Sequence, residues 1–118
     1  MKKNLLCFFI LLAILSIFVY GQQDLLGPIS KEEILKNFPD WQEAAASYWP
    51  KQEVIEKLKS INHEIKIEVF LGTWCTDSKR NVSAYFKIME IVDNPLIQTT
   101  YIGLPKDKES RQAFVQGK

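Results

Sequence analysis

The sequence contains little cysteine and little histidine, with two cysteines, Cys7 and Cys75, and one histidine among 118 residues. Such a small and scattered supply of soft ligands excludes a cysteine-based zinc site. We therefore predict no metal site, and no motif in the chain indicates a bound cofactor.

The chain also lacks an excess of charge of either sign. Lys and Arg number 15 and Asp and Glu number 14, which gives a formal charge of +1 at pH 7. A nearly neutral chain has no electrostatic basis for binding nucleic acid. The composition is otherwise average, with no internal repeat and no low-complexity tract, so it predicts one small globular domain.

The N-terminus resembles a secretory signal peptide. Two lysines precede an apolar run from Leu5 to Tyr20, after which polar residues return. We predict that residues 1–21 are removed by cleavage after Gly21. The alternative is an uncleaved membrane anchor, although the run falls slightly short of the roughly 20 residues that span a bilayer. A lipoprotein is disfavoured, because Cys7 lies at the start of the apolar run.

Cleavage changes both the charge and the thiol content of the chain. It removes two lysines and Cys7, so the formal charge becomes −1 and Cys75 is the only cysteine. No intramolecular disulfide is then possible, in a compartment where disulfides normally form and persist. We expect a protein exported from a bacterial cytoplasm, periplasmic or secreted, that meets the membrane only if the signal segment is retained.

The spacing of apolar residues predicts an α/β protein. A linker and N-terminal helices are expected over residues 22–49, and the main domain over 50–118. The three aromatic residues Trp41, Tyr48 and Trp49 are interpreted as core residues, with a partner site as the alternative. In chain order the pattern predicts helices over 31–38, 40–48 and 51–61, a strand over 65–71, a helix over 75–93, a strand over 97–104 and one or two helical turns within 106–116.

Cys75 falls at the junction between the first predicted strand and the long helix. The strand, helix and strand form a unit whose two strands are expected to be parallel, with a right-handed crossover. A thiol is nucleophilic only as a thiolate, and a helix N-terminus favours the thiolate through its free N–H groups and its dipole. Lys79 and Arg80 can add to this effect, whereas Asp77 opposes it.

The residues around Cys75 resemble the active-site segment of the thioredoxin family. A hydrophobic strand ends in Gly72-Thr73-Trp74-Cys75 and leads into a long amphipathic helix. The family motif is Trp-Cys-x-x-Cys, in which the first cysteine attacks a substrate disulfide and the second resolves the mixed disulfide. The resemblance extends over about residues 50–118 and implies a thioredoxin-like fold.

The resemblance assigns a role to each position of the motif. Trp74 corresponds to the tryptophan beside the nucleophile, and Cys75 corresponds to the attacking cysteine. Thr76 and Asp77 occupy the variable pair. Ser78 stands at the resolving position, where it cannot form a disulfide, although its hydroxyl can donate a hydrogen bond to a Cys75 thiolate. The motif is therefore a monothiol variant.

The end of the sequence also departs from the family pattern. The family has a cis-proline beside the active site, then an antiparallel hairpin and a last helix, and the sequence ends at Lys118 before any such segment. Pro105 lies too near Cys75 in sequence to be that proline. We expect an incomplete thioredoxin-like fold, as in a truncated copy or a fragment, with an exposed strand edge and an uncovered apolar face.

Two function classes remain open at this point. The leading hypothesis is an exported monothiol protein that exchanges disulfides with client proteins or low-molecular-weight thiols through Cys75, a possible thiol-disulfide oxidoreductase without the resolving cysteine. The competing hypothesis is a non-catalytic binding or scaffold module of the cell envelope, which the replacement at Ser78 favours. A peroxidase that uses Cys75 ranks third, and a lone cysteine can also be an inert core residue.

Overall fold

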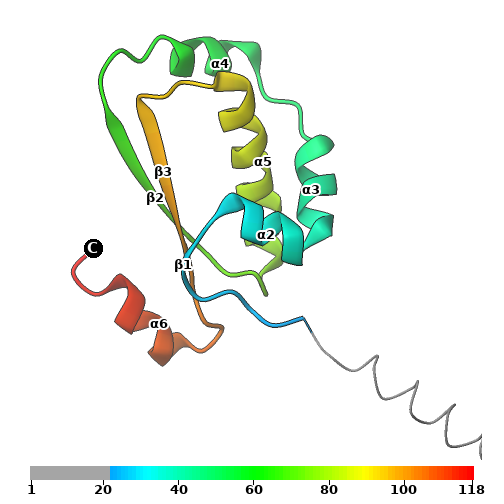
Figure 1. Ribbon diagram of the computed structural model, residues 1–118, viewed down its shortest axis with the longest axis vertical. Coiled ribbons are helices and arrows are strands. Elements are labelled where there is room, and N and C mark those ends of the chain that lie inside the picture. Colours follow the sequence, from blue (N-terminus) through cyan, green and yellow to red (C-terminus); the bar gives the residue numbers. More distant parts are fainter. Residues whose placement is uncertain (1–21) are drawn as a thin grey trace, which may run out of the picture.

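The computed structural model describes residues 22–118, and the predicted signal peptide lies outside them. Three strands and five helices follow one another along this part of the chain (Figure 1). None of its helices combines the length and the apolar character that a bilayer span needs. The elements are β1 (Gly27–Ile29), α2 (Lys31–Asn37), α3 (Pro39–Ala46), α4 (Gln52–Lys59), β2 (Ile65–Leu71), α5 (Thr76–Val92), β3 (Ile97–Gly103) and α6 (Lys108–Val115).

The sheet has the strand order β1-β3-β2 and is mixed. β2 and β3 run parallel, from Ile65 opposite Ile97 to Leu71 opposite Gly103. The α/β class and the parallel strand–helix–strand unit are therefore confirmed. β1 pairs antiparallel with the end of β3, although the sequence pattern predicts a linker at Gly27 and the following proline. A strand of three residues is too short to show the period-two pattern by which strands are recognised.

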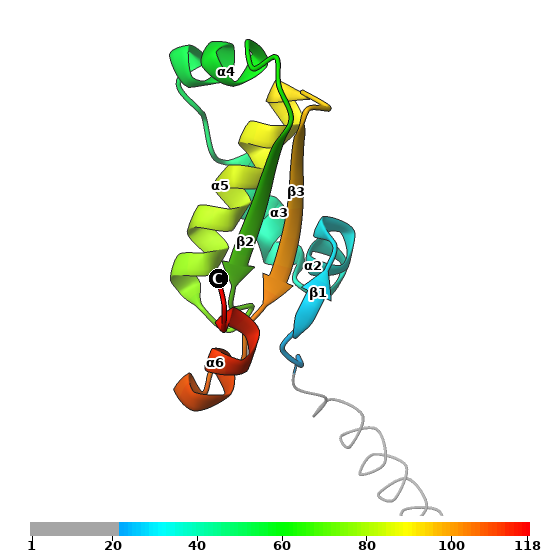
Figure 2. The same ribbon diagram turned by 90° about the vertical axis from the view of Figure 1, so that its left-hand side faces the viewer.

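One face of the sheet is covered by α2, α3 and α5, which lie together on the same side of the strands (Figures 1 and 2). α2 begins with a capping box, in which the Ser30 hydroxyl accepts from the Glu33 N–H and the Glu33 carboxylate accepts from the Ser30 N–H. The buried core between the helices and the sheet consists of Ile34, Phe38, Trp41, Leu71, Val82 and Phe86.

The prediction for the three aromatic residues is correct for one of them and wrong for the other two. Trp41 is 1% exposed and belongs to the core, whereas Tyr48 is 38% and Trp49 83% exposed. α3 ends at Ala46, so Tyr48 and Trp49 lie in the connection that leads to α4. Trp49 contacts the Lys87 ammonium, which lies 5.9 Å from the ring centroid, so its side chain rests on the outer surface of α5.

The second face of the sheet is polar over most of its length. Strand alternation places an exposed set on it, formed by Lys66, Glu68, Gln98 and Thr100. The expectation of an uncovered apolar face is therefore wrong, because only the ends of the strands contribute apolar side chains there, and these are partly buried. β2 is an edge strand of the described sheet, with no strand partner on its outer side within residues 22–118.

Candidate functional site

Cys75 lies where β2 ends and α5 begins. The last residue of β2 is buried Leu71, and a short turn follows in which the Cys75 N–H donates to the Gly72 carbonyl at 3.0 Å. Cys75 is the N-cap residue of the 17-residue helix α5 and has an extended backbone, with φ −102° and ψ 121°. Its side chain is partly exposed and free. The Cys75 side chain is thus partly accessible to solvent, at a position that the backbone fixes.

The surroundings of Cys75 favour the thiolate. The pKa of Cys75 is lowered, first by the backbone N–H of Ser78, which can donate to the thiolate, and further by the Ser78 hydroxyl and the Asp77 N–H. Burial and the Asp77 carboxylate act against this shift and raise the pKa. The neutral thiol makes no N-cap hydrogen bond, so the N–H groups of the first turn remain available to a negative charge.

The two basic residues that follow the motif are engaged elsewhere. The Lys79 ammonium pairs with Asp40 of α3 at 3.2 Å, and the Arg80 guanidinium pairs with Asp77 at 2.9 Å. Neither of these cations is among the main causes of the lowered pKa of Cys75. Their position in the sequence allows such a contribution, whereas the structure assigns the effect to backbone N–H groups and the Ser78 hydroxyl.

Ser78 connects the helix to the end of β2. Its hydroxyl oxygen accepts a hydrogen bond from the Gly72 N–H at 3.0 Å. A hydroxyl can accept one bond and donate another at the same time, so Ser78 can bind the Gly72 N–H and still donate to Cys75. The residue at the resolving position of the motif therefore supports the loop and the thiolate, but offers no second sulfur.

Trp74 is held in a fixed position beside Cys75. Its indole N–H donates to the Leu104 carbonyl at 2.8 Å, and the Arg111 guanidinium of α6 lies 5.6 Å from the centroid of the ring. The indole also packs so closely on Gly72 that a Cβ there would lie 2.5 Å from Trp74 Cε2. Glycine at position 72 is thus required for the indole to occupy this place.

The residues before β1 are tied to the same loop. Thr73 is buried, and its hydroxyl accepts from the Leu25 N–H at 3.1 Å and donates to Asp24 at 3.2 Å. Gly103 allows this segment to pass, because a Cβ there would lie 2.0 Å from the Leu25 carbonyl oxygen. The motif includes Thr73 but predicts no role for it, and no local pattern connects it to a segment 48 residues earlier.

The predicted site residues form one continuous surface feature. Thr76 and Asp77 are exposed in the first turn of α5, while Trp74, Cys75 and Ser78 are partly buried. Within residues 22–118 no three His, Cys, Asp or Glu side chains cluster in a way that could hold a metal ion. The surface around Cys75 thus combines a partly exposed sulfur, the N-terminus of α5 and the Trp74 indole.

Comparison with known proteins agrees with this arrangement. A family model described as Thioredoxin matches residues 30–118, which include both N-terminal helices, the sheet strands β2 and β3, and the Cys75 loop. No curated protein and no solved structure matches the chain significantly. The predicted thioredoxin-like fold class is confirmed. Because the matched segment covers most of the sequence, the chain belongs to the thioredoxin family.

Proposed function

We propose that the protein is exported and takes part in thiol–disulfide exchange as a monothiol, with Cys75 as the nucleophile. The observation that carries the proposal is the position of Cys75, which is partly exposed at the N-cap of α5 with a lowered pKa. A larger thiolate fraction near neutral pH is what a thiol needs for attack on a disulfide.

The exchange proceeds in two balanced steps. The Cys75 thiolate attacks one sulfur of a client disulfide, the client S–S bond breaks, and the other client sulfur leaves as a thiolate. Cys75 is then joined to the client in a mixed disulfide. Because Ser78 has no sulfur, a thiolate from the client or from a low-molecular-weight thiol attacks this mixed disulfide and releases Cys75.

The test is the pH dependence of Cys75 alkylation by iodoacetamide in the full chain. Peptide mass spectrometry follows the Cys75 peptide alone, so that Cys7 does not contribute. We expect half-maximal reactivity below about pH 8.5, the pKa of an unperturbed thiol. A half-point at or above that value contradicts the proposal. Cys75→Ser is the control for reagent specificity.

A second candidate function is a non-catalytic binding module, and the serine at position 78 favours it. Ser78→Cys separates the two, because residues three apart in the first turn of a helix lie within reach of a disulfide. We expect this variant to form a disulfide between Cys75 and the introduced cysteine, and to gain disulfide reductase activity. An unshifted pKa in the natural chain together with no activity in the variant favours the binding module.

Export is tested separately. The full chain is expressed in a bacterial host, and the intact mass of the periplasmic material is measured. We expect a chain that begins at Gln22, because the apolar run ends at Tyr20. A chain of full length in the membrane fraction would instead support the uncleaved anchor.

A further inference from the structure

Arg111 is the cation nearest to the Trp74 indole and comes from a separate element, α6. Its guanidinium carbon lies 5.6 Å from the indole centroid, within the range of a cation–π contact. Arg111 is partly buried, and its Nε has no accessible surface and no hydrogen-bond partner. The stem of the side chain is thus packed in place, and the guanidinium is held beside the residue that precedes Cys75.

Arg111 differs from Lys79 and Arg80 in forming no ion pair within 4.0 Å. Lys79 and Arg80 each form an ion pair within 4.0 Å, whereas no ion pair joins Arg111 to any carboxylate of residues 22–118. The acid one turn before it, Asp107, caps α6 by accepting from the N–H and the hydroxyl of Ser110. The hydrogen bonds from Ser110 are the main cause of the lowered pKa of Asp107, and the positive charge of Arg111 adds to it, yet no ion pair within 4.0 Å joins Asp107 to Arg111.

A guanidinium in a cation–π contact keeps its binding capacity. The contact with the ring uses no N–H hydrogen bond, so N–H donors of the guanidinium remain free for a carboxylate, which they bind in the plane of the group. An arginine that is packed against an aromatic ring loses less side-chain entropy on binding than a mobile lysine does. Arg111 is thus a preorganised carboxylate binder that forms no ion pair within residues 22–118.

We propose that Arg111 selects clients in which an acidic side chain lies two or three residues from the exchanging cysteine. The inference rests on the proposed exchange at Cys75 and names its substrate class. An extended peptide advances about 3.3 Å per residue, so such a side chain reaches about 7–10 Å from the client sulfur. Trp74 is the chain neighbour of Cys75 and the guanidinium lies 5.6 Å from its ring centroid, so we expect such an acidic side chain to reach Arg111.

The test uses three blocked pentapeptides that differ only in their two terminal residues. Each has a central cysteine flanked by glycines, carries Glu, Gln or Lys at both ends, and is supplied as its symmetric disulfide. The rate of mixed-disulfide formation with Cys75 is measured in the full chain at low ionic strength by peptide mass spectrometry. The variants are Arg111→Gln, which removes the charge, and Arg111→Lys, which keeps the charge and removes the planar group.

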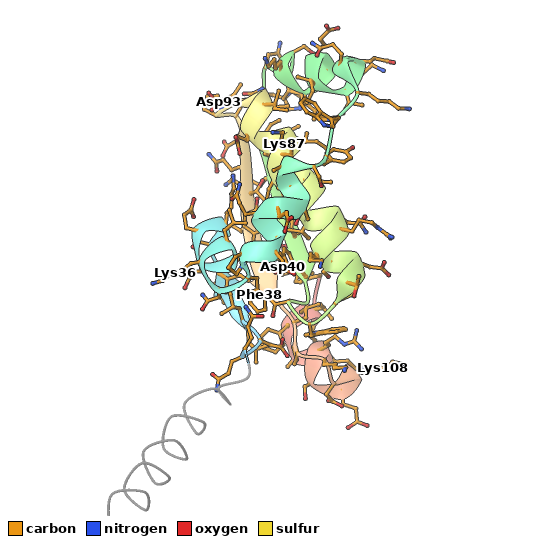
Figure 3. All side chains as sticks on the ribbon, turned by 90° about the vertical axis from the view of Figure 1, so that its right-hand side faces the viewer. Lys36, Phe38, Asp40, Lys87, Asp93 and Lys108 are labelled. Atoms are coloured by element: carbon orange, nitrogen blue, oxygen red, sulfur yellow. The ribbon has the colours of Figure 1, made fainter. Side chains whose placement is uncertain are left out.

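The matched control is Lys108→Gln, on the same helix. Lys108 is exposed, has no ion pair within the described residues, and lies three residues before Arg111 (Figure 3). This variant therefore changes the net charge of α6 as Arg111→Gln does, but leaves the contact with Trp74 intact. Circular dichroism establishes that each variant is folded before its rates are compared.

We expect the natural chain to react about three- to tenfold faster with the Glu peptide than with the Lys peptide, as one charge-assisted contact at a partly exposed site predicts. This ratio falls toward one in Arg111→Gln, falls in part in Arg111→Lys, and persists in Lys108→Gln. The half-point of the Cys75 pH profile stays the same in all four chains, because Arg111 does not contribute to the lowered pKa.

Failure of this inference and failure of the proposed function give different results. A Gln-peptide rate equal to that of an unperturbed thiol counts against the exchange function, yet the Glu-to-Lys ratio is still measured. A ratio that is unchanged in Arg111→Gln, or lost equally in Lys108→Gln, overturns the role of Arg111 whatever the absolute rate. If Arg111→Gln does not fold, the ratio in Arg111→Lys decides, because only a planar edge-on contact requires arginine rather than lysine.

Discussion

The two ends of α5 are built differently. At its N-terminus the cap residue is Cys75, whose thiol makes no capping hydrogen bond and is partly exposed. At its C-terminus the helix is capped by Asp93, which adopts a left-handed conformation with φ 44° and ψ 45° and donates its N–H to the Met89 carbonyl. Figure 3 shows Asp93 far from Lys108, on the end of the molecule remote from α6.

Asn94 adds three hydrogen bonds beside the C-terminus of α5. Its side-chain amide donates to the Leu58 carbonyl at 3.1 Å and to the Ile61 carbonyl at 2.9 Å, and its oxygen accepts from the Leu96 N–H at 3.0 Å. One side chain thus joins the end of α4, the end of α5 and the start of β3. The C-terminal end uses its polar groups for stability, whereas the N-terminal end leaves N–H groups available to a charged sulfur.

The largest effect in this comparison is expected from Asn94→Ala. The substitution removes all three hydrogen bonds, and each contributes about 0.5–1.5 kcal/mol, so the free energy of unfolding should fall by about 2–3 kcal/mol. Urea denaturation followed by circular dichroism measures the loss. The half-point of Cys75 alkylation should not move, because the affected contacts lie at the other end of α5.

The matched control for this experiment is Asn94→Asp. An aspartate keeps the oxygen that accepts from the Leu96 N–H but removes the donors to Leu58 and Ile61. The loss of stability should therefore lie between those of the natural chain and the alanine variant, or approach the latter where the new charge repels the two carbonyls. A shift of the Cys75 pH profile in either variant would show that the two ends of α5 are not independent.

The elements around this helix were predictable because they depend on local pattern. The spacing of apolar residues predicted α2, α5 and both parallel strands. β1 was not predictable, since it has only three residues and pairs with residues of β3 that lie more than 70 positions later in the chain. The exposure of Trp49 was missed for a related reason, because composition gives the amount of apolar surface but not which side of a loop faces the sheet.

The candidate site likewise has a part that the sequence predicts and a part that it does not. The position of Cys75 at a strand-to-helix junction follows from the periodicity of the residues on either side of it. The groups that fix its neighbours do not, because Leu25 and Asp24 precede the site by about 50 residues, while Leu104 and Arg111 follow it by about 30 or more. Such contacts exist only once the chain has folded, and no spacing rule connects these residue types.

A smaller loss of stability is expected from Ser78→Ala, which acts at the N-terminus of α5. The variant loses the hydrogen bond that the Ser78 hydroxyl accepts from the Gly72 N–H, at a cost of about 1 kcal/mol in stability. The pKa of Cys75 should rise, because the hydroxyl helps to lower it, but remain below that of a free thiol, since the backbone N–H of Ser78 is the larger cause and is retained. The alkylation profile over pH measures this change.

A return of the Cys75 half-point to about pH 8.5 in Ser78→Ala would mean that the hydroxyl, and not the helix backbone, activates the sulfur. Ser78→Thr is the matched control, because it keeps a hydroxyl at the same position. It should retain most of the lowered pKa. A threonine variant that behaves like the alanine variant would point to a change in backbone geometry instead.

The smallest effect is expected from Asp77→Asn. Asp77 raises the pKa of Cys75 through its negative charge, while its backbone N–H lowers it. The substitution removes only the charge and frees Arg80 from its ion pair, so the pKa of Cys75 should fall further and alkylation should become faster below the half-point. Stability should fall by about 0.3–1 kcal/mol, because an acidic residue in the first turn of a helix interacts favourably with its dipole.

Asp77→Asn is therefore expected to weaken the helix and, at the same time, to favour the Cys75 thiolate. If Asp77 acted only through the helix dipole, its loss would lower the free energy of unfolding and leave the pKa of Cys75 unchanged. Arg80→Gln is the matched control, because it breaks the same ion pair but leaves the Asp77 charge beside Cys75, and it should raise the pKa or leave it unchanged. A pKa that rises in Asp77→Asn would show that the carboxylate acts on Cys75 through the loop geometry rather than through its charge.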